Sequence, residues 1–396
     1  MTTSSPLAPD RAPLVRQAAT WFGYFLVGTQ IYLFNVQGNV IPLFQDEFGL
    51  SYREVSLHSV ALALGVIVTG LFGQQLTGRI GRKYSLWAGG LGLGIGAFLL
   101  CLSPGLWLSV PSCFLIGMSG GLTGSMVPAV ISDLHSDSRD QAFAEQAIVA
   151  YAFAVLGPVS TGLFVSAGYG WRGAVIVGGV VGIALVLLFR NAAIPLQREA
   201  GPRATGGRLP AAFWAYCCLL GFGCALEFSI LLWGPAFLER EIGFSTAAAA
   251  TGVAGFFVGV LVGRLALRLL VRSLRPRTIL SAAFITGAIG FVLYWWVDQQ
   301  WAAIAGIFML GLCIAPQYPL TMALSLGVAK GAEDLAALRL ILAFGIAILI
   351  APAALGALAD IVGLRAAHLT LPALIAAAFA SFAAAGILER RLNLPA

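Results

Sequence analysis

The stretch AAFWAYCCLLGFGCALEFSILLWGPAFL, residues 211–238, is almost entirely apolar and holds one charged side chain, Glu227. A run of this length can cross a hydrocarbon core about 30 Å thick as a single helix. The whole chain has the same character, because 59% of its 396 residues are hydrophobic and only 10% are charged. Soluble proteins carry about 25% charged residues, so this composition indicates a multi-pass membrane protein.

Comparable apolar runs recur along the chain, separated by polar or Gly- and Pro-containing turns. They are continuous rather than alternating, which excludes a membrane β-barrel. We therefore predict an all-α polytopic membrane protein with twelve transmembrane helices. The predicted spans are 17–43, 55–78, 84–102, 106–130, 141–168, 173–190, 211–238, 246–271, 277–298, 301–328, 335–358 and 366–388.

The basic residues predict the orientation of these spans. With the amino terminus inside, all but Arg53, Arg172, Arg240 and Arg365 of the 23 Lys and Arg residues fall on the cytoplasmic side. That asymmetry follows the positive-inside rule and explains the net charge of +6 without a nucleic-acid partner. Arg264 belongs to this predicted cytoplasmic set. We expect a monomer in a bacterial inner membrane, with both termini cytoplasmic.

Weak self-similarity appears at an offset of about half the chain. The matches are ordered and nearly constant in spacing, and they involve mainly Gly and Pro, which suggests shared backbone geometry. The matched pairs are Pro42 and Pro235, Gly117 and Gly311, Pro158 and Pro352, and Gly162 and Gly356. The chain is thus predicted to repeat a unit of six helices.

The repeat predicts the domain organisation. Two bundles, 17–190 and 211–390, are joined by a polar, basic linker, 191–210, and flanked by cytoplasmic tails, 1–16 and 391–396. An even number of helices gives both bundles the same orientation, related by an axis along the membrane normal. A cleft between them near the midplane is the expected binding site.

The loop between the second and third spans carries the sequence QQLTGRIGRK, residues 74–83. It resembles the Gly-x-Leu-x-Asp-Arg-x-Gly-Arg-Arg signature of the major facilitator superfamily of secondary transporters, with Gly78 in the place of the Asp. A fainter copy is GVLVGRLALR, residues 259–268. The resemblance covers nearly the whole chain and implies two pseudo-symmetric six-helix bundles that work by alternating access.

The same resemblance implies a cytoplasmic latch that holds the two halves together in the outward-open state. Arg79, Arg82 and Lys83 are its basic residues, and Asp133 matches another acidic position of the family, from which it could pair with Arg82. LGPVSTG, residues 156–162, resembles the Gly-Pro element of the proton antiporters of the family. The alternative reading of that element is a proline kink with close helix packing.

Glu227 is the principal functional candidate. A charge at the centre of a bilayer costs about 2.5–3.5 kcal/mol on insertion scales, and intramembrane carboxyls are usually functional. The other acidic residues fall in loops or near predicted span ends, and no Lys or Arg is predicted at the depth of Glu227. Because desolvation disfavours the ion, Glu227 can take up and release a proton. The alternative is a protonated, structural Glu bonded to a neighbour.

Solute-binding candidates are polar and aromatic side chains within the spans. Tyr32, Asn35 and Asn39 share one face of the first helix, whereas Gln30 and Gln37 lie roughly opposite, and we expect the Asn face to line the cleft. The further candidates are Tyr151, Tyr216, Trp233, Gln317 and Tyr318. Core packing is the alternative role for each of them.

The sequence predicts a proton-coupled transporter of a small neutral or cationic organic solute, because no deep cation is predicted to offset an anion. Export by proton antiport is the first expectation, and proton symport of a neutral solute such as a sugar is the alternative. A non-transporting membrane sensor is the alternative from another class. The sequence lacks a nucleophile–base cluster, metal-ligand spacing or a phosphate loop, so we expect no enzyme activity, metal or cofactor, with the proton gradient as energy source.

Overall fold

The computed structural model describes residues 15–136, 138–195, 209–329 and 333–392, and in these ranges the chain is helical, without strands. Most of the predicted linker and of the amino-terminal tail lies outside them. The first half contains α1 (Ala18–Phe48), α2 (Tyr52–Ile80), α3 (Arg82–Cys101), α4 (Leu106–Leu134), α5 (Arg139–Ser166) and α6 (Arg172–Leu188). The second half contains α7 (Ala211–Arg240), α8 (Thr246–Gly252), α9 (Ala254–Leu270), α10 (Pro276–Trp296), α11 (Gln300–Ile314), α12 (Gln317–Val328), α13 (Glu333–Val362), α14 (Leu364–Ala367) and α15 (Thr370–Leu392).

In the described residues, ten helical segments are long and apolar enough to cross a membrane, and three of them join consecutive helices, α8 with α9, α11 with α12 and α14 with α15. Helix α6 is a shorter apolar helix of 17 residues. Helix α1 has 31 residues, but its amide side chains lower its hydropathy. Together these form the two sets of six predicted from the sequence.

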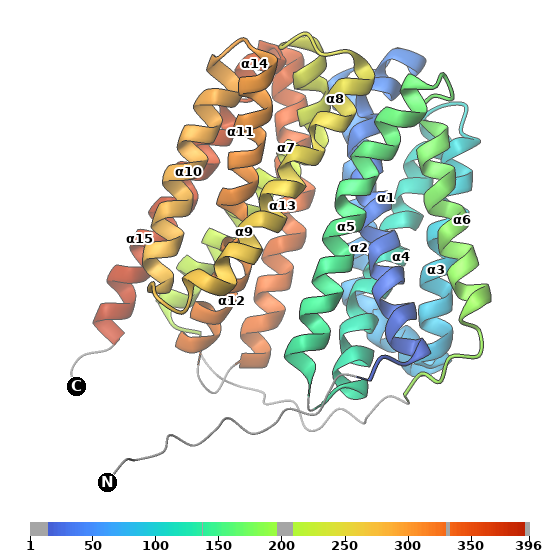
Figure 1. Ribbon diagram of the computed structural model, residues 1–396, viewed down its shortest axis with the longest axis horizontal. Coiled ribbons are helices and arrows are strands. Elements are labelled where there is room, and N and C mark those ends of the chain that lie inside the picture. Colours follow the sequence, from blue (N-terminus) through green and yellow to red (C-terminus); the bar gives the residue numbers. More distant parts are fainter. Residues whose placement is uncertain (1–14, 137, 196–208, 330–332, 393–396) are drawn as a thin grey trace.

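Figure 1 shows the first half, in blue and green, beside the second half, in yellow to red, with the start of α1 and the end of α15 on the same side. We call that side the terminal face; Ala18 of α1 and Leu392 of α15 lie there. The opposite face holds Phe48 at the end of α1 and Tyr52 at the start of α2. All the long helices run between these two faces.

The predicted repeat is confirmed by equivalent contacts in the two halves. Gly117 of α4 packs on the carbonyl of Leu62 in α2, and Gly311 of α11 packs on the carbonyl of Phe256 in α9. Each pair is shifted by 194 residues. Small residues let membrane helices approach this closely, so both halves use the same packing geometry.

Polar contacts at the opposite face repeat as well. Arg172 donates from Nε to the carbonyl of Cys101 at 3.0 Å, and Arg365, 193 residues later, donates from Nη2 to the carbonyl of Trp295 at 3.0 Å. Each Arg also pairs with a carboxylate, at 2.6 Å and 2.5 Å respectively. The same clamp therefore joins the third and last helices of each half.

Local signals explain where several helices begin and end. Ser51 and Glu54 form a capping box that starts α2, with the Ser51 hydroxyl accepting from the Glu54 amide. Gly49 ends α1 with φ of 63°, and Gly81 separates α2 from α3 with φ of 83°. Glycine adopts positive φ without steric penalty, so it fits these two sharp reversals.

The two halves are joined mainly at the opposite face. There, Arg240 of α7 pairs with Asp46 of α1 at 3.1 Å and donates to the Tyr52 hydroxyl at 2.9 Å. The Asp360 carboxylate, at the end of α13, accepts from the backbone amides of Tyr52 and Arg53 at 2.9 and 2.8 Å. These contacts close this structure at the opposite face.

Candidate functional site

Glu227 lies near the middle of α7. The residues around it are apolar, so this part of the helix lies in the membrane interior. The Glu227 side chain is partly buried, and among the described residues it has no Lys, Arg or His within 4.0 Å. The nearest cation is Arg264 of α9, which is within electrostatic range of the carboxyl. Glu227 is therefore attracted to a cation without being paired with it.

The position of Arg264 corrects the sequence interpretation. It was counted among the cytoplasmic cations, although the predicted span 246–271 contains it; α9 runs to Leu270 and places Arg264 inside a membrane-crossing segment. The guanidinium carbon lies 4.8 Å from the centroid of the Tyr151 ring, on α5 of the other half. Arg264 Nε is buried and has no hydrogen-bond partner. The expectation that no cation shares the depth of Glu227 is thus wrong.

Three of the predicted solute-binding residues lie near Glu227 or Arg264. Tyr151 lies against Arg264 and within electrostatic range of Glu227, and Tyr318 lies within electrostatic range of Arg264 and is 42% exposed. Gln317 packs on Gly223 of α7, one turn before Glu227, and its Oε1 atom has no partner. Glu227, Arg264, Tyr151, Gln317 and Tyr318 together form what we call the charged cluster.

The first helix differs from the expectation. The Tyr32 hydroxyl bonds to Ser160 at 2.7 Å and donates to the Ala174 carbonyl at 2.9 Å, both within the first half. Asn35 packs on Gly157 of α5, and the Asn39 amide donates back to the Asn35 carbonyl. The Asn face therefore packs inside the first bundle rather than lining the cleft.

The opposite side of α1 borders the second half. Thr123 of α4 donates to Gln30 Oε1 at 2.7 Å, and Gln37 Nε2 donates to the His58 carbonyl at 3.0 Å. Gly38 lies so close to α7 that a Cβ atom there would stand 2.5 Å from the carbonyl oxygen of Leu231. Gly38 and Gln37, which lines a pocket together with residues of α7, therefore face the interface, whereas Gln30 bonds within the first half.

Two further candidates lie away from the charged cluster. Tyr216 sits near the terminal face, where its hydroxyl contacts Glu389 and Arg277 within the second half. Trp233 is fully buried, donates from its indole nitrogen to the Pro352 carbonyl at 2.8 Å and packs edge-on against Tyr52. Tyr216 therefore holds three helices together, and Trp233 helps to close the opposite face.

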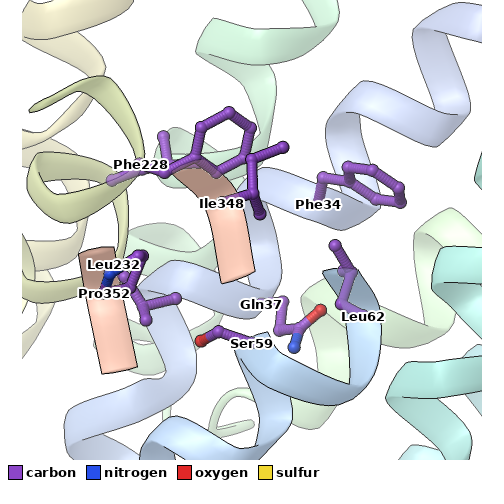
Figure 2. Close-up of a pocket in the computed structure, with 9 residues that line it drawn as sticks. Phe34, Gln37, Ser59, Leu62, Phe228, Leu232, Ile348 and Pro352 are labelled. Carbon is purple, nitrogen blue, oxygen red and sulfur yellow. The ribbon is translucent and has the colours of Figure 1, made fainter. Parts of the chain in front are cut away.

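A small pocket lies between the halves, about one turn from Glu227 toward the opposite face. Figure 2 shows Gln37 and Ser59 on one side of it, facing Phe228 and Ile348 of the other half. Gln37 Oε1 and Ser59 Oγ are buried without a hydrogen-bond partner. The full lining is Phe34, Gln37, Ser59 and Leu62 from α1 and α2, and Phe228, Leu231, Leu232, Ile348 and Pro352 from α7 and α13.

Comparison with known proteins agrees with this architecture. The model of a family described as the Major Facilitator Superfamily matches residues 20–330, most of the chain. The chain belongs to this superfamily. Its apolar membrane-crossing helices agree with that membership.

Curated members of the superfamily match over part of their length. Solute carrier family 2, facilitated glucose transporter member 6, of Homo sapiens is 25% identical over 42% of this chain and 31% of its own. Multidrug resistance protein MdtG of Yersinia enterocolitica is 26% identical over 39% and 37%, and the arabinose-proton symporter of Escherichia coli is 25% identical over 26% and 22%. The matches thus span about a third or less of these relatives.

Solved structures of the superfamily match almost the whole chain. A bacterial homologue of the human lysosomal transporter Spinster, in an inward-facing and occupied conformation, aligns with a TM-score of 0.77 at 14% identity, covering 94% of this chain and 96% of that one. A mutant of the nucleoside transporter NupG aligns with a TM-score of 0.76 at 11% identity, covering 92% and 99%. At these identities the likeness establishes the fold alone.

The superfamily's loop signature occupies the end of α2 and the start of α3. Arg82 pairs with Asp133 at 2.6 Å, as predicted, and both side chains are largely buried. Arg79 is exposed, and the Lys83 ammonium lies over the Trp87 ring at 5.2 Å. The Arg82–Asp133 pair lies within the first half, so in this structure it does not join the two halves.

Arg264 is the residue that sequence reasoning missed, although the repeat contained the signal. The fainter signature copy aligned it with Arg79 of the loop. The offset of 194 residues that relates the glycine contacts instead aligns it with Gly70, inside α2. Applying one offset throughout would have assigned Arg264 to the interior of its predicted span, 246–271, rather than to the cytoplasmic cations.

Proposed function

We propose that this protein is a proton-coupled secondary transporter of a small organic solute, with Glu227 as the proton site. The proposal is carried by one observation. Glu227 is an unpaired carboxyl at mid-depth in α7, beside a cation and at the junction of the two halves. An ionisable group in such a place is expensive to keep unless it changes charge during the working cycle.

The arrangement supports coupling by alternating access. When Glu227 is ionised, Arg264 attracts it; when Glu227 is protonated, that attraction is lost. Tyr151 and Arg264 belong to different halves, so the change alters contacts across the interface. A proton can therefore shift the balance between the two access states.

We further propose that the terminal face is cytoplasmic, from the distribution of Lys and Arg along the chain. With the opposite face closed by Arg240 and Asp360, this structure would then be the inward-facing state. Arg79, Arg82 and Lys83 would act as a latch with Asp133 only when the terminal face closes. That role fits their lack of polar contacts with the second half here.

Export by proton antiport is the first candidate for the direction, since the Gly-Pro element of α5 resembles that of antiporters and a matching relative is named a multidrug resistance protein. Import by proton symport is the second. It is favoured by the unpartnered Gln37 and Ser59 oxygens, which suit a hydroxylated solute, and by a matching relative named an arabinose-proton symporter. Arg264 removes the earlier reason to favour cationic solutes over others.

The test is transport into proteoliposomes under an imposed pH gradient, with a solute first selected by a thermal-shift screen across solute classes. We expect Glu227→Gln to abolish concentrative flux and its pH dependence, because the amide cannot carry a proton. Glu241→Gln, which removes a carboxylate at the end of the same helix, is the matched control and should transport normally. Active flux with an unchanged pH response in Glu227→Gln would exclude Glu227 from coupling. Solute moving against the proton flux would indicate export.

A further inference from the structure

Arg264 is a partly buried cation that attracts Glu227 but is not paired with it. Its Nε atom is shielded from solvent and has no hydrogen-bond partner, and within the described residues no carboxylate oxygen lies within 4.0 Å of its guanidinium. Burying an unsatisfied charged donor is costly, and structures normally satisfy such groups. The group that completes Arg264 is therefore expected from outside the chain.

Tyr151 holds Arg264 in place. The guanidinium carbon lies over the Tyr151 ring, 4.8 Å from its centroid, a contact that favours the charged group at this position. Tyr318, within electrostatic range of Arg264, is 42% exposed, so one member of the charged cluster is accessible from outside the chain. A planar guanidinium held in this way matches a carboxylate, which can accept two parallel hydrogen bonds.

From this geometry we infer that the transported solute carries a carboxylate or an equivalent acidic group, which binds Arg264 against the face of Tyr151. The inference rests on the proposed function, since it names the solute class of that transporter. The bound acid would lie between α5 of the first half and α9 of the second, so solute binding would bear directly on how the halves meet. The unpartnered Gln37 and Ser59 oxygens, one turn beyond Glu227, would then contact the rest of the solute as the halves move.

Glu227 would compete with the solute acid for Arg264. In the described residues, the groups within electrostatic range of Glu227 are Arg264 on α9, Tyr151 on α5 and Cys224 on its own helix. Arg264 is the one cation among these three groups, so an ionised Glu227 weakens the attraction of Arg264 for an external acid. Replacing the carboxyl by a neutral amide should therefore strengthen acid binding.

The test compares matched acids and amides on the full-length protein in nanodiscs. The probes are gluconate and gluconamide, benzoate and benzamide, and hexanoate and hexanamide, with apparent affinities taken from ligand-dependent melting temperatures. We expect at least one acid to bind and its amide to bind far more weakly. Arg264→Gln should weaken that acid about 30-fold, as expected when one partner of a buried charge pair is removed.

Matched variants separate a binding role from a folding role. Arg268→Gln removes an exposed cation one turn further along α9 and should leave affinity unchanged. Arg264→Lys keeps the charge but loses the planar fork, so it should retain part of the acid preference. If Arg264→Gln does not fold, Arg264→Lys and Tyr151→Leu decide instead, and both should weaken the acid severalfold.

The inference is overturned if no acid of the panel binds, if an amide binds as well as its acid, or if the Arg264 variants keep the full acid preference. Its failure is distinguishable from failure of the proposed function. Glu227→Gln should bind the acid more tightly than the wild type whether or not Glu227 couples protons. Acid binding through Arg264 together with normal pH-dependent flux in Glu227→Gln would overturn the coupling role and leave the solute class standing.

Discussion

At the scale of single residues, glycines set how closely the helices of each half approach. Gly117 of α4 packs against the backbone of Leu62 in α2, and its repeat partner Gly311 packs in the same way against α9. An added Cβ atom at either position would meet a backbone carbonyl, which cannot rotate away as a side chain can. These contacts therefore fix the distance between two helix axes.

We predict that Gly117→Ala destabilises the protein by about 1–3 kcal/mol, the usual cost of overpacking a tight contact. The measurement is the apparent melting temperature of detergent-purified protein, together with its monodisperse fraction. Gly78→Ala is the control, because nothing lies within 4 Å of a Cβ atom there and alanine favours the helix. Melting of Gly117→Ala at or above the wild-type temperature would show that the helices can separate at little cost.

At the scale of elements, the start of α2 depends on the other half of the molecule. The first amides of a helix lack partners within the helix, and Asp360 of α13 accepts from two of them, at Tyr52 and Arg53. The negative charge also suits the positive end of the helix dipole. A cap supplied by another bundle holds only while the opposite face is closed.

We predict that Asp360→Ala loosens the first turn of α2. A capping side chain is worth about 1 kcal/mol, so the amides of that turn should exchange with deuterium about fivefold faster. Hydrogen exchange read by mass spectrometry on peptides covering 50–58 and 85–95 would show the change in the first peptide alone. Asp298→Ala, which removes a carboxylate that pairs with Arg365 within one half, should leave both peptides unchanged.

For the first helix, the sequence pattern predicts two polar faces but not the neighbour that each face contacts. The spacing of Tyr32, Asn35 and Asn39 identified one polar face of α1, and that of Gln30 and Gln37 identified another. Periodicity assigns residues to faces, but it does not say which neighbour each face meets. The contacts of Tyr32 with Ser160 and Ala174 decide that question, and they are fixed by how α5 and α6 pack.

At the scale of the whole molecule, the proposed alternating access requires the two halves to part at the face where they now meet. Gly162 of α5 and Thr251 of α8 face each other across the halves near the opposite face, where a Cβ atom on Gly162 would lie 3.2 Å from that of Thr251. Natural disulfides have Cβ atoms about 3.5–4.5 Å apart, so the bond requires the two helices to separate slightly, which also relieves the contact of the new Cβ atom with the Ala247 carbonyl. A covalent bond here would hold the opposite face closed.

We predict that the Gly162→Cys, Thr251→Cys double variant forms a disulfide that abolishes transport, and that reduction restores it. The background should lack the exposed thiol of Cys218. Flux into proteoliposomes, measured before and after oxidant and reductant, is the readout, and each single-cysteine variant is the control. Undiminished flux in the fully cross-linked protein would mean that the halves do not separate at this face during the cycle.

The sequence by itself determined the membrane class, the helical fold and the repeat, because each is written in local composition and in spacing along the chain. Apolar runs of span length require helices in lipid, and Pro42 with Pro235 and Gly117 with Gly311 recur at a near-constant offset. It also singled out Glu227 and the pairing of Arg82 with Asp133, because an isolated charge in an apolar run, or a family motif, needs no tertiary information to be noticed.

Only the tertiary structure decided what surrounds Glu227. Arg264, 37 residues away in the chain, and Tyr151, in the other half, reach it because α7, α9 and α5 converge between the bundles. The packing also moved Tyr216 and Trp233 away from the charged cluster and turned the asparagines of α1 inward. Helix rotation and tilt are set by the sum of many weak side-chain contacts between distant segments, and no local pattern encodes that sum.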